Sequence, residues 1–184
     1  MARPRWPAPA VMATDRLRLE PLRAEHATEA FPLFDDVRLH AWTGGAPAGW
    51  PEFAEQYRRR AAGQSPDGGR GWLNWLLRHT ADQRLVGLVQ ATLYRPRPAL
   101  LAAELAWVIG SDYQGRGFAR EAAIAMTGWL AEQGVGEFTA LIHPGHAASI
   151  AIARRLALTS TGTERDGEVL WIGTPDWMGI DRRT

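Results

Sequence analysis

The sequence predicts a mixed α/β domain built around a central glycine-rich loop. Apolar or alternating segments typical of strands are interleaved with segments of helical spacing. Between one strand and one helix stands GSDYQGRGFAREAA (110–123), which holds three glycines within eight positions before it becomes alanine-rich. Glycine costs conformational entropy, so the bare backbone must serve a purpose here. The length of 184 residues indicates a single domain over 1–184.

In the first half of the chain, residues 1–13 are rich in proline and alanine, and we expect a flexible arm. Residues 16–22 alternate polar and apolar side chains, which predicts a half-buried strand. Helices are expected over 24–34 and over 51–62, the second with a proline in its first turn. Its three consecutive arginines are interpreted as a solvated face. Glycine and other turn residues predict a loop over 61–71.

In the second half, 72–80 and 84–94 form a predicted β-hairpin, and 101–110 is the next strand. After the glycine loop, apolar residues at helical spacing continue up to Gly134, a plausible residue to end the helix. The remaining expected elements are a strand, a helix and a last strand, at 137–143, 146–157 and 168–174.

Composition excludes several classes of function. With 21 basic and 20 acidic residues the net charge is +1, which argues against nucleic-acid binding. No apolar run reaches the ~20 residues of a membrane span, and the N-terminus lacks the apolar core of a signal peptide. We therefore expect a cytoplasmic protein. The absence of cysteine excludes thiolate chemistry and zinc–sulfur sites.

A glycine-rich turn before a helix is suited to bind an anion, because backbone N–H groups and the helix dipole converge there. The phosphate loop of NTPases requires a lysine, and this chain has none. The dinucleotide fingerprint GxGxxG fits poorly, because Arg120 stands at its third glycine. Glu137, twenty residues after Gly117, begins the next strand instead of ending it, where a ribose would lie.

A third pattern, Q-x-x-G-x-A, is met by Gln114, Gly117 and Ala119. With it the chain resembles the GNAT superfamily of acetyl-CoA-dependent N-acetyltransferases. ELAWVIGSDYQGRGFAREA (104–122) is similar to the segment that binds the coenzyme A pyrophosphate in that superfamily. The T-x-R-L-x-L start at Thr14 is similar to that of its RimJ/RimL-like branch. The resemblance extends over roughly residues 14–173.

The resemblance implies a GNAT fold. Its central sheet is twisted and mostly antiparallel, with six to seven strands that splay apart between the fourth and the fifth, and about four helices flank it. It also implies acetyl-CoA as cosubstrate, with no metal. The residues it implies for binding acetyl-CoA are Trp107, Val108, Ile109, Gln114, Gly115, Arg116, Gly117, Phe118, Ala119, His146 and Ser149. An N–H near Val108 would polarise the thioester carbonyl.

Transfer to an amine requires a base, and Glu104 is the candidate. It is an acidic residue in an apolar strand, where burial would raise its pKa toward the working range. The RimJ/RimL-like branch places a glutamate at this position, which implies the same role, directly or through one water. The competing interpretation is a carboxylate that faces solvent or forms a structural ion pair.

The helix at 146–157 departs from the superfamily pattern. His146 replaces its asparagine, Ala153 its tyrosine acid, and Ala157–Leu158 its Gly-Phe pair. The resemblance implies that Ser149 then hydrogen-bonds the departing thiolate. An acyl-CoA-binding module with lost or altered catalysis is therefore the alternative function. His143 and His146 are not expected to bind a metal, because no third ligand lies nearby in the sequence.

The amine acceptor is not determined by the sequence. The resemblance implies a protein N-terminus or a small-molecule amine. The acceptor pocket would come from the first helices, 40–50, 61–71 and 94–100. These segments and their borders supply Trp42, Trp50 and Trp72 with few carboxylates, which argues against a polycationic acceptor. A monomer and a homodimer both remain open.

Overall fold

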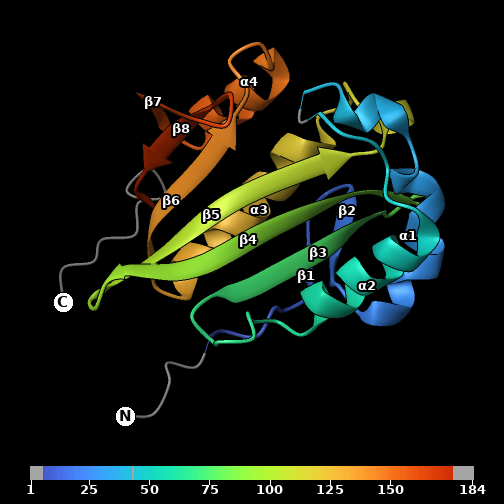
Figure 1. The fold of residues 1–184 in the computed structure, drawn as a ribbon, viewed down its shortest axis with the longest axis horizontal. Helices are drawn as coiled ribbons and strands as arrows, with labels where there is room; N and C mark the ends of the chain where they lie inside the picture. Colours follow the sequence, from blue (N-terminus) through green and yellow to red (C-terminus); the bar gives the residue numbers. More distant parts are fainter. Residues whose placement is uncertain (1–5, 43, 176–184) are drawn as a thin grey trace.

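The computed structural model describes residues 6–42 and 44–175, which form one eight-stranded sheet with helices on both faces (Figure 1). The strand order is β1-β2-β3-β4-β5-β6-β8-β7. The strands are β1 (Met12–Ala13), β2 (Leu17–Pro21), β3 (Gly71–His79), β4 (Leu85–Arg97), β5 (Leu100–Ile109), β6 (Val135–Ile142), β7 (Thr159–Arg165) and β8 (Glu168–Gly173). The α-helices are α1 (Ala27–Phe34), α2 (Trp50–Ala61), α3 (Phe118–Glu132) and α4 (Ala147–Arg155), with short 3₁₀ turns η1 (Ala24–His26), η2 (Val37–His40) and η3 (Ser111–Tyr113).

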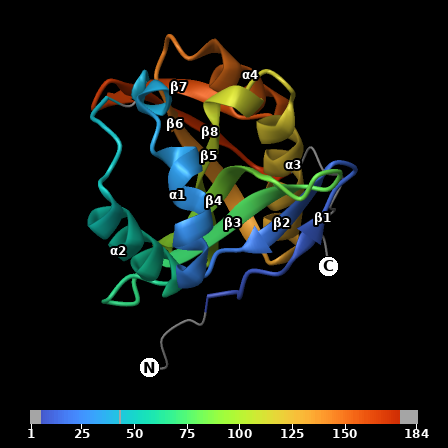
Figure 2. The same cartoon turned by 90° about the vertical axis from the view of Figure 1, so that its right-hand side faces the viewer.

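The two faces of the sheet carry different side chains. Successive residues of a strand point to opposite faces, and in β3, in β4 from Val89 onward and in β5 the odd-numbered core residues pack on the side of α3. Leu73, Trp75 and Leu105 belong to that larger core together with residues of α3 and α4. Leu76 and Leu88 point the other way, into a smaller core with Phe53 and Tyr57 of α2. Figure 2 shows the sheet between α1 and α2 on one side and α3 on the other.

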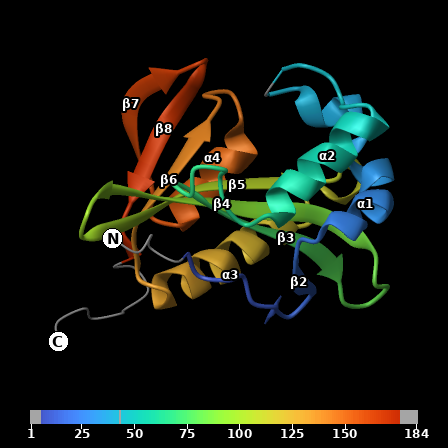
Figure 3. The same cartoon turned by 60° about the horizontal axis from the view of Figure 1, so that its bottom comes forward.

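Strands β5 and β6 are parallel and pair only at one end. Their register runs from Leu101 opposite Val135 to Glu104 opposite Thr139, and no pairing follows. Beyond this point β6 pairs with β8 alone. Figure 1 shows the two strands in contact at one end and separated at the other, and in Figure 3 the β6–β8–β7 unit is inclined to the rest of the sheet. The predicted splay between the fourth and fifth expected strands is confirmed, and it opens a gap beside Leu105–Ile109.

The sheet has two strands more than the six segments that the sequence predicts, and one more than the expected six to seven. The two-residue strand β1 is too short to show a pattern. Strand β7 is exposed along its whole length, so no apolar alternation marks it. The expected helix over 24–34 begins as the 3₁₀ turn η1 and becomes α-helical at Ala27.

The expected flexible arm is wrong from Trp6 onward. The Trp6 indole N–H donates to the Gly68 carbonyl (3.2 Å), and its ring packs against the larger core. The indole N–H of Trp75 donates to the carbonyl of Ala10 (2.8 Å), which attaches the N-terminal segment to β3. Large aromatic surfaces of this kind outweigh the composition of the segment. Residues 1–5 lie outside the described part, and within that part no helix is long and apolar enough to span a membrane.

Candidate active site

The glycine loop connects η3 to the first turn of α3. Gly115 (φ 75°) and Gly117 (φ 81°) both adopt the left-handed conformation, and Gly117 is the residue that caps α3. A Cβ at Gly115 would meet nothing within 4 Å, so the torsion angles, not crowding, require glycine there. The loop thus presents the free N–H groups of a helix start, which favour a bound anion.

An ion pair behind the loop holds it in place. Arg16 pairs with Glu121 at 2.6 Å and donates to the carbonyl of Arg116 at 3.0 Å. Burial of Glu121 raises its pKa, but hydrogen bonds from Thr14 and Arg16 outweigh this, and the net pKa is lowered. Glu121 therefore stays ionised and neutralises Arg16, because an opposite charge and donated hydrogen bonds favour the charged form.

Two other arginines remain available on the loop. Arg116 donates to the Asp112 carbonyl (3.0 Å) and lies over the Tyr113 ring, and Arg120 is exposed. In the described part of the chain neither contacts a carboxylate, so both can contribute positive charge to a bound anion. Arg120 was considered above only as a misfit to the dinucleotide fingerprint. Its place in the first turn of a helix is the signal that could have found it.

Three other residues expected to bind the cofactor have structural contacts in the fold. The Gln114 amide donates to the Ile109 carbonyl (3.0 Å), which ties the loop to the end of β5. The Phe118 side chain is buried in the larger core. Phe118 was expected to bind the cofactor, and its burial leaves only its backbone N–H for that purpose. Ala119 is half-buried and packs against the same core.

The divergence of β6 leaves main-chain groups of β5 without a strand partner. The N–H of Gly110 donates to the carbonyl of Val86. Along an antiparallel ladder, residues that stand opposite each other alternate between hydrogen-bonded and non-hydrogen-bonded pairs, so every second residue of β5 bonds to β4. Val108 is therefore a hydrogen-bonded pair with Leu88, and its N–H points to β4. The N–H groups of Trp107 and Ile109 point into the gap instead. This register specifies the expected donor near Val108: the N–H groups without a partner in β4 belong to its two neighbours, and Val108 contributes an exposed side chain (38%).

Ser149 lies across the gap, in the first turn of α4. The Trp107 indole N–H donates to the Ser149 hydroxyl oxygen at 3.1 Å. An indole N–H can only donate, so the hydroxyl accepts from it and keeps its own proton for another acceptor. The structure thus brings together two residues that the sequence analysis selected for separate reasons.

His146 caps α4. Its ring Nδ1 accepts the Ser149 N–H at 3.4 Å, as an asparagine side chain does at such a position. Trp42 stacks on the His146 ring with centroids 5.1 Å apart and also contacts His143. Burial, together with the neighbouring His143, lowers the pKa of His146. The ring is therefore neutral near pH 7, which suits its role as acceptor.

Glu104 lies where β5 and β6 begin to diverge. It stands opposite Thr92 of β4 and opposite Thr139 of β6. Its side chain is half-buried, and within the described residues it has no ion pair or hydrogen bond. The structural ion pair that the sequence left open is absent from that part of the chain. The hydroxyl of Thr139, opposite Glu104, is buried without a hydrogen-bond partner, so among the described residues two polar groups without an internal partner meet at the divergence point.

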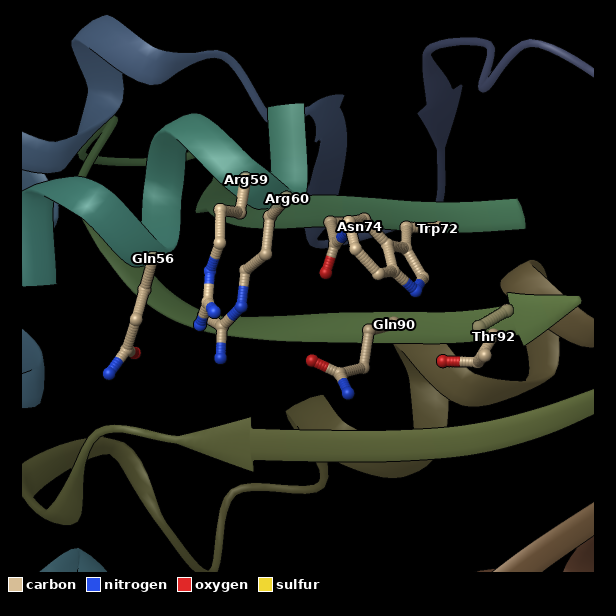
Figure 4. A pocket seen from close by; sticks show the side chains of 8 residues that line it. Gln56, Arg59, Arg60, Trp72, Asn74, Gln90 and Thr92 are labelled. Atoms are coloured by element: carbon tan, nitrogen blue, oxygen red, sulfur yellow. The ribbon is translucent and has the colours of Figure 1, made fainter. Parts of the chain in front are cut away.

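A cavity of about 280 Å³ opens on the same face of the sheet, beneath α2 (Figure 4). It is lined by Gln56, Arg59, Arg60, Trp72, Asn74, Gln90, Ala91 and Thr92. The arginine run of α2 is therefore only partly a solvated face: Arg58 pairs with Glu55, but Arg59 and Arg60 line the cavity. The sequence could not show this, because it does not tell which face of α2 meets the sheet.

Of the three tryptophans expected in an acceptor pocket, Trp72 lines this cavity. The Trp50 ring packs edge-on against Phe31 (5.4 Å), and Trp42 covers His146 instead. Of the elements expected to build the acceptor pocket, only the second helix, α2, lines this cavity, together with β3 and β4; no described lining residue comes from 40–50, 61–71 or 94–100.

Comparison with known proteins identifies the class. A family model described as "Acetyltransferase (GNAT) domain" matches residues 16–159. The chain belongs to the GNAT family, and it is an acetyl-CoA-dependent acetyltransferase. No curated protein matches it in sequence.

Solved structures share the fold at low identity. An acetyltransferase from Agrobacterium tumefaciens has a TM-score of 0.69 at 21% identity, covering 94% of this chain and 99% of that one. RimL, a ribosomal L7/L12 alpha-N-protein acetyltransferase, has a TM-score of 0.72 at 16% identity, with 90% and 94% covered. Aminoglycoside acetyltransferase AAC(6')-Ib in complex with coenzyme A has a TM-score of 0.71 at 14% identity, with 91% and 99% covered. The presence of RimL agrees with the resemblance to the RimJ/RimL-like branch.

Proposed function

We propose that the protein is an N-acetyltransferase that moves the acetyl group of acetyl-CoA to a primary amine by direct attack in a ternary complex. One observation carries the proposal: the unpartnered Glu104 lies where β5 and β6 diverge, between a polar cavity and an open main-chain edge. Neighbours of the same fold are named for acetylating a ribosomal protein and aminoglycosides, so the acceptor is a protein N-terminus or a small-molecule amine. The single domain, the monomer or homodimer and the cytoplasmic location stay predictions.

The described residues fit acetyl-CoA. The left-handed glycines and the start of α3 suit the pyrophosphate, with Arg116 and Arg120 adding charge. The free edge of Leu105–Ile109 suits an extended arm that pairs with the backbone as a strand would. When bound, acetyl-CoA supplies an acyl carbon activated as a thioester.

Glu104 is proposed as the general base. An α-amine has a pKa near ~8 and a lysine amine near ~10.4, so each must lose a proton to attack at pH 7. A carboxylate without an internal partner can accept this proton directly or through one water. Its neighbour Thr92 lines the cavity, so an amine bound there lies next to the carboxylate.

Trp107 and Ser149 are proposed to complete the reaction. The main-chain N–H of Trp107, which points into the gap, can stabilise the negative charge that develops on the thioester oxygen. This effect is worth roughly 3–4 kcal/mol for a well-placed donor. The Ser149 hydroxyl accepts from the Trp107 indole, so its proton is free to be donated to the departing sulfur.

Thermal unfolding with acetyl-CoA, coenzyme A, NAD or ATP tests the cofactor first. A ligand at ~100 times its Kd stabilises by about 2.7 kcal/mol, which is several degrees for a domain of this size. Only the coenzyme A compounds are expected to shift the transition. A shift with NAD or ATP alone would contradict the proposal.

The variant Glu104→Gln then tests the base. It keeps the shape of the side chain, so the thermal shift with acetyl-CoA should persist, while thiol release in the presence of amines falls by about 10²–10⁴-fold. Wild-type-like turnover in Glu104→Gln at pH 7 would exclude Glu104 as the base. Glu132→Gln, which makes the same chemical change at the exposed last residue of α3 and far from the cavity, is the matched control and should lose far less.

A further inference from the structure

The cavity beneath α2 has an unbalanced charge. Among the described residues that line it, Arg59 and Arg60 are the only ones with ionisable side chains. Within the described residues neither contacts a carboxylate, and Arg60 lies over the Tyr57 ring at 6.0 Å. A guanidinium keeps its charge at any physiological pH. Arg58, one residue earlier, has its charge balanced by Glu55 at 2.8 Å on the outer side of the helix.

Arg60 is also partly withdrawn from water. Its side chain is half-buried, and burial lowers its pKa, although the arginine stays protonated. A charge in such a place is costly unless an opposite charge compensates it. Figure 4 shows Arg59 and Arg60 extending from α2 toward β4 at one end of the cavity. This end is therefore suited to bind an anionic group.

The middle and the far end of the cavity are polar but neutral. The side chains of Asn74, Gln90 and Thr92 have no hydrogen-bond partner in the described part of the chain, and Asn74 is buried. Groups that are left unpartnered in a cavity are available to a ligand. In Figure 4, Thr92 and Trp72 lie at the end away from the arginines.

Glu104 continues this row of side chains. Trp72 stands opposite Thr92, and Thr92 opposite Glu104, so the three lie on one face in three adjacent strands. Opposite residues in neighbouring strands have Cβ atoms about 5 Å apart. One molecule in the cavity can therefore place its amine at Glu104 and an anionic group at the arginines, provided that the two groups lie at opposite ends of the molecule.

We propose that the acceptor is a small primary amine that carries a carboxylate, of the size of an amino acid. This inference rests on the proposed function and specifies its substrate. A guanidinium pair binds a carboxylate through charge-assisted and bidentate hydrogen bonds. The volume of about 280 Å³ lies just below the range of pockets for drug-sized ligands, which favours a small acceptor over a folded protein terminus.

Matched acceptors test the charge. Amino acids that carry the amine and the carboxylate at opposite ends of the chain are compared with their primary amides, which have the same size but no carboxylate, at fixed acetyl-CoA with thiol release as the readout. The carboxylates are expected to have a kcat/KM about 10–100-fold higher, as a lost charge-assisted hydrogen bond predicts. Equal or better turnover of the amides, or of peptides with a free N-terminus and an amidated C-terminus, would overturn the inference.

Variants of α2 identify the site. Arg60→Gln and Arg59→Gln should raise KM for the carboxylate acceptor by about 10–100-fold and leave the amide acceptor and acetyl-CoA unaffected. Arg58→Gln removes the same charge from the outer side of the same helix and is the control, with no expected change. Arg60→Lys should recover part of the loss, and melting curves show that each variant is folded.

The two proposals fail in different ways. If acetyl-CoA stabilises the protein but no amine of either kind releases thiol, the proposed function fails. In that case calorimetry with the amino acids still tests the cavity, because carboxylate binding lost in Arg60→Gln supports the inference without turnover. If amines are acetylated and the arginine variants behave as Arg58→Gln does, only the inference about the carboxylate is wrong.

Discussion

Two regions of this molecule are suited to bind anions, and they are built differently. The glycine loop at the start of α3 relies on its backbone: two left-handed glycines and the free N–H groups of a helix start. The cavity beneath α2 relies on side chains from α2, β3 and β4 that meet only in the folded protein. Both regions also hold arginines without a carboxylate partner in the described part of the chain.

The difference teaches where specificity is encoded. A loop made of backbone torsions binds what every member of an enzyme class shares, and its glycines leave a local sequence signature. A cavity made of side chains can change its ligand through single substitutions that leave the fold intact. The two regions should therefore respond to mutation independently, the loop through acetyl-CoA and the cavity through the acceptor.

The largest effect on acetyl-CoA binding is expected where the backbone of the glycine loop itself is changed. Gly117→Ala places a Cβ on a residue with φ 81°, which costs about 1–2 kcal/mol and corresponds to a 5- to 30-fold loss of acetyl-CoA affinity if the loop must keep its shape. Gly134→Ala is the control, since it imposes the same strain (φ 90°) at the other end of α3, where a Cβ meets nothing within 4 Å. Calorimetry should show a loss of affinity only in Gly117→Ala; equal affinities would mean that the loop does not bind the cofactor.

An intermediate effect, on kcat, is expected for the residues that face the gap between β5 and β6. Ser149→Ala removes the proposed proton donor, and kcat should fall roughly fivefold, because a thiol with a pKa near ~8.5 is already a fair leaving group. Trp107→Phe leaves the hydroxyl but removes the 3.1 Å hydrogen bond that orients it, so a smaller loss is expected. Steady-state kinetics measures both effects. If the kcat of Ser149→Ala equals that of the wild type, Ser149 has a structural role alone.

The smallest effect concerns pH and the cap of α4. The pKa of His146 is lowered by burial in the folded protein, as is that of His26, whereas an unfolded histidine has a pKa near ~6.5. The unfolded chain therefore binds these protons first, and stability is lost as the pH falls below about 6.5. His146→Asn replaces the capping ring nitrogen by an amide oxygen that does not titrate, so the free energy of unfolding should decline less between pH 7 and pH 5. Denaturant melts across that interval measure it, and an unchanged decline would assign the effect to other groups.

The sequence predicts the parts of this molecule that are encoded locally. Six strands and four helices appear near their expected positions, because their apolar spacing matches the face they bury. Gly134 ends α3 as expected, with φ 90°. Strand β7 was missed because it is exposed throughout, and the attachment of Trp6 because its partner at Gly68 is distant in the chain.

The candidate site divides along the same line. The glycine loop could be recognised from the sequence because its residues are close together in the chain. The main-chain donor could not be, because only the register of β4 against β5 shows that Val108 N–H is used and Trp107 N–H is free. Likewise, the sequence does not distinguish the three consecutive arginines of α2. Only the packing of the helix shows that Arg58 is paired with Glu55 and that Arg59 and Arg60 line the cavity.

The gap between β5 and β6 also affects how the protein behaves outside its reaction. Leu105–Ile109 is an unpaired strand edge in the middle of a sheet, and none of its five residues is charged or a proline. Natural sheets usually protect such edges, because an extended segment of another chain can pair with them and start aggregation. The edge that we propose to pair with the arm of acetyl-CoA is thus also open to pairing with another copy of the chain. Anything that fills the gap should therefore act as a stabiliser during purification and storage.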